Sequence, residues 1–276
     1  MLDNGVHGIF TCGTLGETMA LTQAERDRAI RIAADASQGK AKVFAGVMDT
    51  STKRVIENIK RIADCGCDAA VITPVFYDRH TSQGEIIRLF EDVAAATKID
   101  LIAYNIPSFV VEKIDPATVS ALADIDAVKG YKDSAAVFND TVKVLNSLAD
   151  REDFSVLSGT PVQYMPSALL GCDGCVPGMA SMYPKVFVEA YNASLTGDVE
   201  KMRKFNKLIC LAGSVYASAK NGTAAVKYAV STMGFMDERI IRPQDGVSPA
   251  EQEKIHKQMA ICAETFAAEG VESVLC

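Results

Sequence analysis

The sequence lacks the features that mark three common classes of protein. It has no apolar run that approaches the length of a membrane-spanning helix, so we expect no transmembrane segment. It has no basic tract and no interleaving of basic with aromatic residues, which argues against nucleic acid as a partner. The first residues, Met1 to Gly5, show no basic segment followed by an apolar one, so we expect no signal peptide and a cytoplasmic location.

Metal ligands at zinc-site spacing are also scarce. Cys172 and Cys175 form a C-x-x-C pair, but no companion pair follows at zinc-finger distance. The three histidines do not cluster near that pair: His7, His80 and His256. A metal or dithiol site remains an alternative here, but buried free thiols in a reducing cytosol explain the eight cysteines better, and we expect no metal.

The chain has enough apolar residues to form a large core. Its 276 residues are 49% hydrophobic and 23% charged, with a net charge of -7. This is the composition of an ordinary, mildly acidic globular protein. The length suits one α/β barrel with some additional helices.

Short apolar runs alternate with segments of helical period over the first two thirds of the chain. Continuous apolar strands between amphipathic helices predict a parallel sheet covered by helices, and their even spacing favours a closed barrel. Seven runs are expected to be strands: Gly8 to Cys12, Lys42 to Met48, Ala69 to Phe76, Leu101 to Pro107, Ala127 to Ser134, Phe154 to Gly159, and Gly174 to Ala180.

A TIM (β/α)8 barrel needs eight strands, and the sequence offers seven. The chain opens at Leu2 to Gly5, which has the character of a helix end, so we expect a barrel that lacks its first βα unit. Such a start could be real or reflect a mistaken start codon or a truncated gene. We place the incomplete barrel at residues 1–196 and a C-terminal helical bundle, packed on it, at 197–276.

A lysine near the end of the fifth predicted strand is the main candidate for chemistry. Side chains alternate along a strand, so Lys132 shares its face with Val128 and Gly130 and points where apolar side chains point. Burial lowers the pKa of a lysine and makes the neutral amine available as a nucleophile. The alternative is a lysine just beyond the strand, solvated or ion-paired with Asp133.

Two other strand ends carry residues suited to a site. In the turn from Gly13 to Glu17, glycines allow backbone N–H groups to converge on a small anion. Tyr104 places a phenol at the end of the fourth strand. Taken singly, a tight turn with two glycines and a packed rim tyrosine explain these residues equally well.

The same residues, in this order and spacing, make the chain resemble the dihydrodipicolinate synthase/N-acetylneuraminate lyase family of pyruvate-dependent class I aldolases. The resemblance runs from about Gly5 to about Glu251 and rests on six motifs: Gly-Thr-x-Gly-Glu from Gly13, Thr73-Pro74 before Phe76 and Tyr77, Tyr104-Asn105-x-Pro107, Gly130-x-Lys132-Asp133-Ser134, Ser158-Gly159, and Gly171-x-Asp173-Gly174.

The resemblance implies a role for each matching residue. Lys132 would form a Schiff base with a 2-oxo acid such as pyruvate, and Tyr104 would move the protons. Thr14 would orient the phenol, while the backbone around Gly13 and Leu15 would hold the carboxylate. Substrate contacts are also expected at Phe76, Phe109 and Gly159. No metal or organic cofactor is implied, and the expected assembly is a homotetramer.

Three departures from the family pattern bear on the substrate. Leu15 replaces a hydroxyl residue, Phe76 replaces a tyrosine that is lent across the subunit interface, and Phe109 replaces an arginine that clamps a second carboxylate. A phenyl ring cannot supply that bidentate contact. These changes favour a sugar-acid or sialic-acid type of lyase. The alternatives are a 4-hydroxy-tetrahydrodipicolinate synthase and a catalytically silent relative that only binds a small carboxylic acid.

Overall fold

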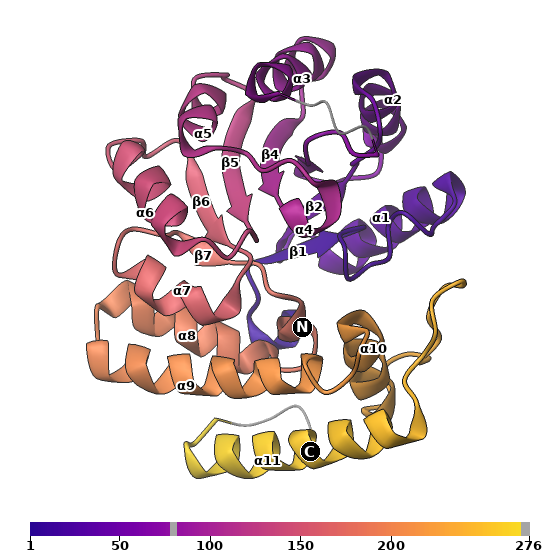
Figure 1. Ribbon diagram of the computed structural model, residues 1–276, viewed down its shortest axis with the longest axis vertical. Helices are drawn as coiled ribbons and strands as arrows, with labels where there is room; N and C mark the ends of the chain where they lie inside the picture. The colour runs from indigo at the N-terminus through magenta and orange to yellow at the C-terminus, as the bar shows by residue number, and fades with distance from the viewer. Residues whose placement is uncertain (78–81, 272–276) are drawn as a thin grey trace. The chain divides into compact units, whose positions relative to one another are not determined.

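The chain divides into two compact units, each of which is described by itself. The structure is a computed structural model that describes residues 1–77 and 82–271 (Figure 1), so His80 lies outside the described residues. One unit is His7–Val176, and the other combines Met1–Val6 with Pro177–Cys276. We predicted a boundary after residue 196. The units divide before Pro177 instead, because α8 (Pro184–Thr196) packs with α9 (Val199–Tyr216).

The His7–Val176 unit is built on one sheet of parallel strands in sequence order, as predicted. The described residues do not form a closed eight-stranded barrel, because the sheet ends at its first and last strands. The strands are β1 (Gly8–Thr11), β2 (Lys42–Gly46), β3 (Ala69–Ile72), β4 (Asp100–Asn105), β5 (Val128–Asp133), β6 (Ser155–Ser158) and β7 (Gly174–Cys175).

The last strand is shorter than we predicted. We expected it to run from Gly174 to Ala180, but β7 has two residues, and Gly178–Ser181 forms a 3-10 helix. Pro177 stands between the two elements and has no backbone N–H for a strand ladder. Proline therefore accounts for the early end of β7.

Helices connect successive strands and, apart from the short α4 (Pro107–Val110), pack on one face of the sheet, which we call the outer face (Figure 1). The first begins at a capping box, in which the Thr22 backbone N–H donates to Glu25 Oε2 at 2.7 Å and the Glu25 N–H donates to Thr22 Oγ1 at 3.4 Å. The helices are α1 (Gln23–Ser37), α2 (Thr52–Ile62), α3 (Gln83–Ala96), α4 (Pro107–Val110), α5 (Pro116–Ala123), α6 (Phe138–Ser147) and α7 (Pro161–Ala168).

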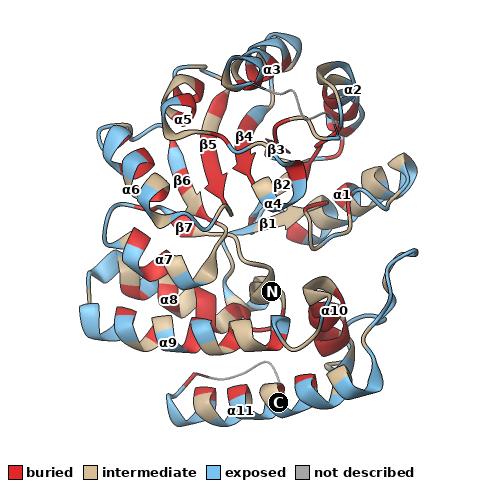
Figure 2. Cartoon of the chain, viewed as in Figure 1, coloured by how far each residue is buried: buried red, intermediate tan, exposed pale blue. Residues whose placement is uncertain are grey.

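The opposite, inner face of the sheet carries an apolar cluster in which one tyrosine is included. Phe10, Phe44 and Phe76 are partly buried and pack against it. Its buried members are Ala69, Val71, Ile102, Tyr104, Ile106 and Val110. Figure 2 shows β4 and β5 as largely buried strands at the centre of the sheet.

The second unit is built from helices, and helices were predicted for residues 197–276. Tyr183, just before α8, packs edge-on against Phe266 of α11 (Pro249–Ala268) with ring centroids 5.1 Å apart. The elements are η1 (Leu2–Asn4), η2 (Gly178–Ser181), α8, α9, α10 (Gly222–Thr232) and α11 (Pro249–Ala268). Among the described helices, none is both long and apolar enough to cross a membrane.

Candidate active site

Lys132 occupies the next-to-last position of β5, with its side chain on the inner face. It is 7% exposed, and its Nζ lies 4.1 Å from the ring centroid of Tyr104 and 4.7 Å from that of Phe10. The alternative of a solvated lysine, or one paired with Asp133, is therefore wrong. The Asp133 carboxylate lies on the outer face, where it accepts a hydrogen bond from Thr141 Oγ1 of α6 at 2.9 Å.

Burial changes the acid–base chemistry of this amine. Desolvation lowers the pKa of Lys132 from its ordinary value of 10.5 to about 7. The faces of Phe10 and Tyr104 attract the ammonium form, but this attraction is small against the cost of removing a charge from water. A substantial fraction of Lys132 is thus a neutral amine near neutral pH, which is the form that attacks a carbonyl carbon.

Tyr104 stands beside the amine because β4 and β5 pair in register. Tyr104 is the strand partner of Lys132, so both side chains leave the sheet on the same face. The phenol oxygen accepts a hydrogen bond from Ser134 Oγ at 3.4 Å, and the ring packs edge-on against Phe10 at a centroid distance of 6.0 Å. Sequence reasoning gave Ser134 no role, although it belongs to the lysine motif.

Gly159 follows β6 and leaves room for the lysine. A Cβ at this position would come within 3.0 Å of Lys132 Cε and would overlap the Ser134 hydroxyl. Any larger residue at position 159 would therefore displace the side chains of Lys132 and Ser134. The effect of Gly159 on Lys132 is steric, and the predicted contact of Gly159 with the substrate stays a prediction.

The glycine turn after β1 is shaped around an aromatic ring. A Cβ at Gly13 would lie 2.9 Å from the ring of Phe10, which is the ring that faces Lys132. The turn is closed by backbone hydrogen bonds from Glu17 N to the Thr14 carbonyl at 3.0 Å and from Thr18 N to the Gly13 carbonyl at 3.4 Å. Thr14 and Leu15 are both half-buried, and their roles toward the phenol and the carboxylate stay predictions.

The two predicted phenylalanines lie in different surroundings. Phe76 packs against the inner cluster that contains Tyr104. Phe109, in the short helix α4, is 63% exposed, so the described part of the chain does not bury its ring. Tyr77 is 95% exposed with a φ of 80°. An exposed ring at position 109 offers no cation for a second carboxylate.

The cysteine pair is poorly suited to redox chemistry. Burial raises the pKa of Cys172 to about 11 and raises that of Cys175 further. Cys172 Sγ donates to the carbonyl oxygens of Val156 and Gly174, at 3.2 and 3.3 Å. Thiols in this state are weak nucleophiles. Within residues 1–77 and 82–271, no group of three or more His, Cys, Asp or Glu side chains is placed to hold a metal ion.

The site places a buried amine beside a phenol at the carboxyl ends of adjacent parallel strands, and these are the groups that an imine-forming α/β enzyme needs. The family model described as "Dihydrodipicolinate synthetase family" matches residues 1–262, and the chain belongs to this family of pyruvate-dependent class I aldolases. The predicted family and enzyme class are thereby confirmed.

Individual relatives cover nearly the whole chain. The 4-hydroxy-tetrahydrodipicolinate synthase of Anaeromyxobacter dehalogenans is 29% identical over 94% of this chain and 86% of its own length. The solved dihydrodipicolinate synthase from Bacteroides thetaiotaomicron has a TM-score of 0.88 at 29% identity, covering 94% of this chain and 88% of that one.

A more distant solved structure shows the same fold. YagE, a dihydrodipicolinic acid synthase family protein from E. coli K12 solved in complex with pyruvate, has a TM-score of 0.89 at 24% identity. It covers 95% of this chain and 88% of its own. The α/β architecture is therefore that of the family, and at this identity the likeness concerns the fold alone.

Proposed function

We propose that this protein is a Schiff-base lyase that cleaves a 2-oxo acid into pyruvate and an aldehyde, or condenses the two. The observation that carries the proposal is the buried Lys132 amine, with a pKa of about 7, whose Nζ lies 4.1 Å from the centre of the Tyr104 ring. Without a lowered pKa, a lysine is almost entirely protonated at neutral pH and does not attack carbonyl carbon.

The chemistry begins with the amine. The neutral Nζ of Lys132 attacks the 2-oxo carbon, and Tyr104 donates its proton to the departing oxygen, which leaves as water. The products of this step are a protonated imine and a phenolate. In this mechanism the backbone of the turn at Gly13, Thr14 and Leu15 binds the substrate carboxylate, and Thr14 orients the phenol.

The phenolate then removes the proton from the substrate hydroxyl at carbon 4. The bond between carbons 3 and 4 breaks, its electron pair moves into the imine to give an enamine, and the aldehyde leaves. Tyr104 returns its proton to carbon 3. Water, deprotonated by the phenolate, adds to the imine and releases pyruvate and the free amine. Over one cycle Tyr104 gives up two protons, to the departing water and to carbon 3, and takes up two, from the hydroxyl at carbon 4 and from the attacking water.

The substrate proposed is of the sugar-acid or sialic-acid type, with an uncharged aldehyde portion. The exposed Phe109 and the half-buried Leu15 and Phe76 support this, because none of them pairs with a second carboxylate. The second candidate is 4-hydroxy-tetrahydrodipicolinate synthase, and the name of the A. dehalogenans relative favours it. A catalytically silent relative that only binds a small acid is the third reading.

The proposal has further parts that follow the resemblance. It includes no metal or organic cofactor, since the imine itself accepts the electrons. It includes assembly into a homotetramer. It also includes a cytoplasmic location, which is supported by the free thiols of all seven cysteines in the described part of the chain.

Borohydride reduction in the presence of pyruvate tests the proposal. We expect a stable adduct on the peptide that contains Lys132, detected by mass spectrometry, and none when pyruvate is omitted. Assays of pyruvate release across a panel of 2-oxo-3-deoxy acids, set beside condensation with a carboxylate-bearing aldehyde, then separate the two candidate reactions. Folded protein with an unmodified Lys132 would contradict both reactions and leave the binding-only reading.

Removing the phenol hydroxyl separates the proton transfers from imine formation. We expect Tyr104→Phe to lower kcat for pyruvate release by roughly 10²- to 10⁴-fold, the range of a lost general acid–base group. The adduct on Lys132 should still form, more slowly. Tyr216→Phe, at the end of α9, is the control and should retain activity. An active Tyr104→Phe variant would assign the proton transfers to another group.

A further inference from the structure

The ends of β4 and β5 are joined on the outer face by a buried side-chain amide. Asn105 is 3% exposed, and its Nδ2 donates to Tyr131 Oη at 2.9 Å and to Asp133 Oδ1 at 3.0 Å. Its Oδ1 accepts from the backbone N–H of Ile114 at 3.0 Å. The amide therefore uses both its donors and its acceptor at once, and it joins β5 to the segment at Ile114 that follows α4.

This amide lies one residue from the reacting pair. The strand register pairs Asn105 with Asp133 and, immediately before them, Tyr104 with Lys132. Because alternate side chains point to opposite faces, Asn105 and Asp133 do not face the substrate. They hold the register of the two strands at the point where the phenol and the amine leave the sheet.

The backbone of the same two residues holds the groups around the amine. The Ser134 N–H donates to the Asn105 carbonyl at 2.8 Å, and the Gly159 N–H donates to the Asp133 carbonyl at 2.6 Å. Ser134 contacts the Tyr104 hydroxyl, and Gly159 makes room for Lys132. A shift of the Asn105–Asp133 pair therefore moves the contacts of both Tyr104 and Lys132.

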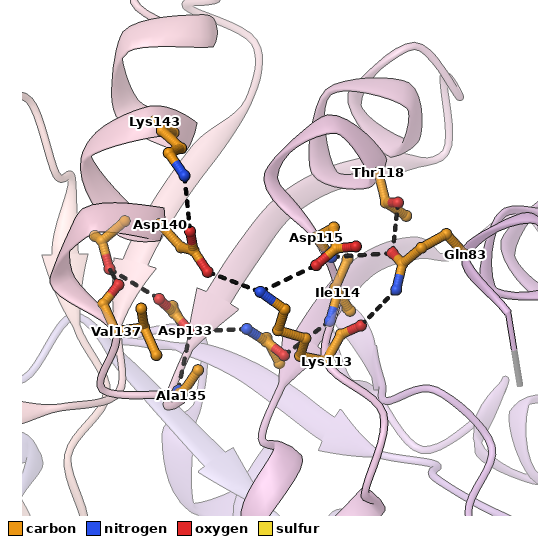
Figure 3. Close-up of polar contacts among 12 residues, drawn as sticks. Gln83, Lys113, Ile114, Asp115, Thr118, Asp133, Ala135, Val137, Asp140 and Lys143 are labelled. Carbon is orange, nitrogen blue, oxygen red and sulfur yellow. Dashed lines mark hydrogen bonds and ion pairs between the residues drawn. The ribbon is translucent and has the colours of Figure 1, made fainter. Parts of the chain in front are cut away.

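The partners of the carboxylate complete the network. Asp133 is 5% exposed and accepts from the Ala135 N–H at 3.0 Å and from Thr141 Oγ1 at 2.9 Å, in addition to the Asn105 amide (Figure 3). Together these three donors satisfy both oxygens of a buried carboxyl group, and a buried acceptor that loses its donor is costly. Removing one donor leaves the carboxylate less well paired.

The contacts of Lys113 and Gln83, also drawn in Figure 3, contribute less to holding the strand ends. Lys113 Nζ pairs with Asp140 at 3.0 Å and with Asp115 at 3.1 Å, but its side chain is 47% exposed. Gln83 Nε2 donates to the Lys113 carbonyl at 2.8 Å and ties the same segment to α3. Solvent screens such exposed pairs, so the buried Asn105 amide is the part of the network that fixes the strand ends.

We propose that Asn105 is a positioning residue that sets the geometry of Lys132 and Tyr104 for imine chemistry. The inference rests on the proposed function, and it concerns a residue that touches no reacting atom. Misplacing reacting groups by about 1 Å costs roughly 10²-fold in rate, so the loss of this amide is expected to appear in kcat more than in KM.

Asn105→Asp tests the proposal, because it keeps the shape and removes the donor. Its new carboxylate faces Asp133 at hydrogen-bond distance, so one of the two groups has a raised pKa and takes up a proton as the pH falls. The protonated carboxyl then donates as the amide did. We expect kcat to fall roughly 10- to 100-fold at pH 8. The ratio of variant to wild-type kcat should recover toward one at lower pH.

Asn58→Asp is the matched control. Asn58 is likewise buried, and its Nδ2 donates to Asp49 Oδ2 at 3.1 Å and to the Val47 carbonyl at 3.2 Å, so it too is an amide beside an aspartate in the same unit. We expect it to lower stability while its kcat stays within about threefold of wild type. Equal kcat losses in both variants would show that Asn105 acts through stability alone.

Borohydride trapping of pyruvate by a second variant and by the wild type also tests the positioning role of Asn105. If Asn105→Asp does not fold, Thr141→Val removes one donor to Asp133 without adding charge and should slow borohydride trapping of pyruvate several-fold. A wild-type protein that traps no pyruvate would refute the proposed function. The positioning role alone would be refuted if the wild type traps pyruvate and Asn105→Asp traps it at the same rate. If Asn105→Asp does not fold, the same comparison is made with Thr141→Val.

Discussion

Lys132→Ala is expected to abolish measurable pyruvate release from every 2-oxo acid tested, which is a loss of roughly 10³-fold or more in kcat. The variant has no amine on the inner face beside Tyr104, and a methyl group forms no covalent intermediate. Lys132→Arg should be equally inactive, because a guanidinium stays protonated and does not form the imine. Pyruvate release by a coupled assay and borohydride trapping measure the two losses independently.

Lys129→Ala is the matched control for this result. Lys129 lies three residues earlier on the same strand, pairs with Asp126 at 3.3 Å, and has a side chain that is 37% exposed. We expect its activity and its trapping at Lys132 to match the wild type. Adduct formation in the Lys132→Ala variant at a wild-type rate would place the imine on another lysine and remove the basis of the proposed mechanism.

Most of what could be predicted about the site came from the alternation of side chains along the strands. Alternation along a strand places Lys132 on the apolar face, and the structure confirms that face and its burial. The same local rule cannot place Phe109, whose exposure depends on how α4 turns after β4. It also gave β7 too many residues, since apolar character continues past the point where Pro177 ends the ladder.

The Asn105 network shows a second limit of sequence reasoning. The two bonds that the Asn105 amide donates reach residues 26 and 28 positions away, and they arise only when β4 and β5 pair in one register. In the sequence, Asn105 before Ile106 and Pro107 has the composition of an ordinary turn. A usable signal was present: two polar residues, Asn105 and Asp133, each follow the candidate catalytic residue of neighbouring strands.

Replacing Lys132 with methionine is expected to stabilise the protein, by an amount that depends on pH. The folded-state pKa of Lys132 is about 7 and the ordinary value is 10.5, so between these values the unfolded chain binds more protons than the folded one. Stability of the wild type therefore rises with pH across this window. The cost of burying the amine is fully present below about pH 7 and disappears as the pH rises through 10.5.

The shift corresponds to a free energy on the order of 4 kcal/mol at pH 7. Methionine has a similar length and no charge, so the Lys132→Met variant lacks this penalty at every pH. Urea unfolding at pH 7, 8, 9 and 10 should give the variant its largest advantage at pH 7 and a much smaller one at pH 10. Lys129→Met, exposed on the same strand, should show no such trend. An equal gain in the free energy of unfolding at all four pH values would mean that the folded protein leaves the pKa of Lys132 unchanged. The neutral nucleophile on which the proposed chemistry depends would then be missing.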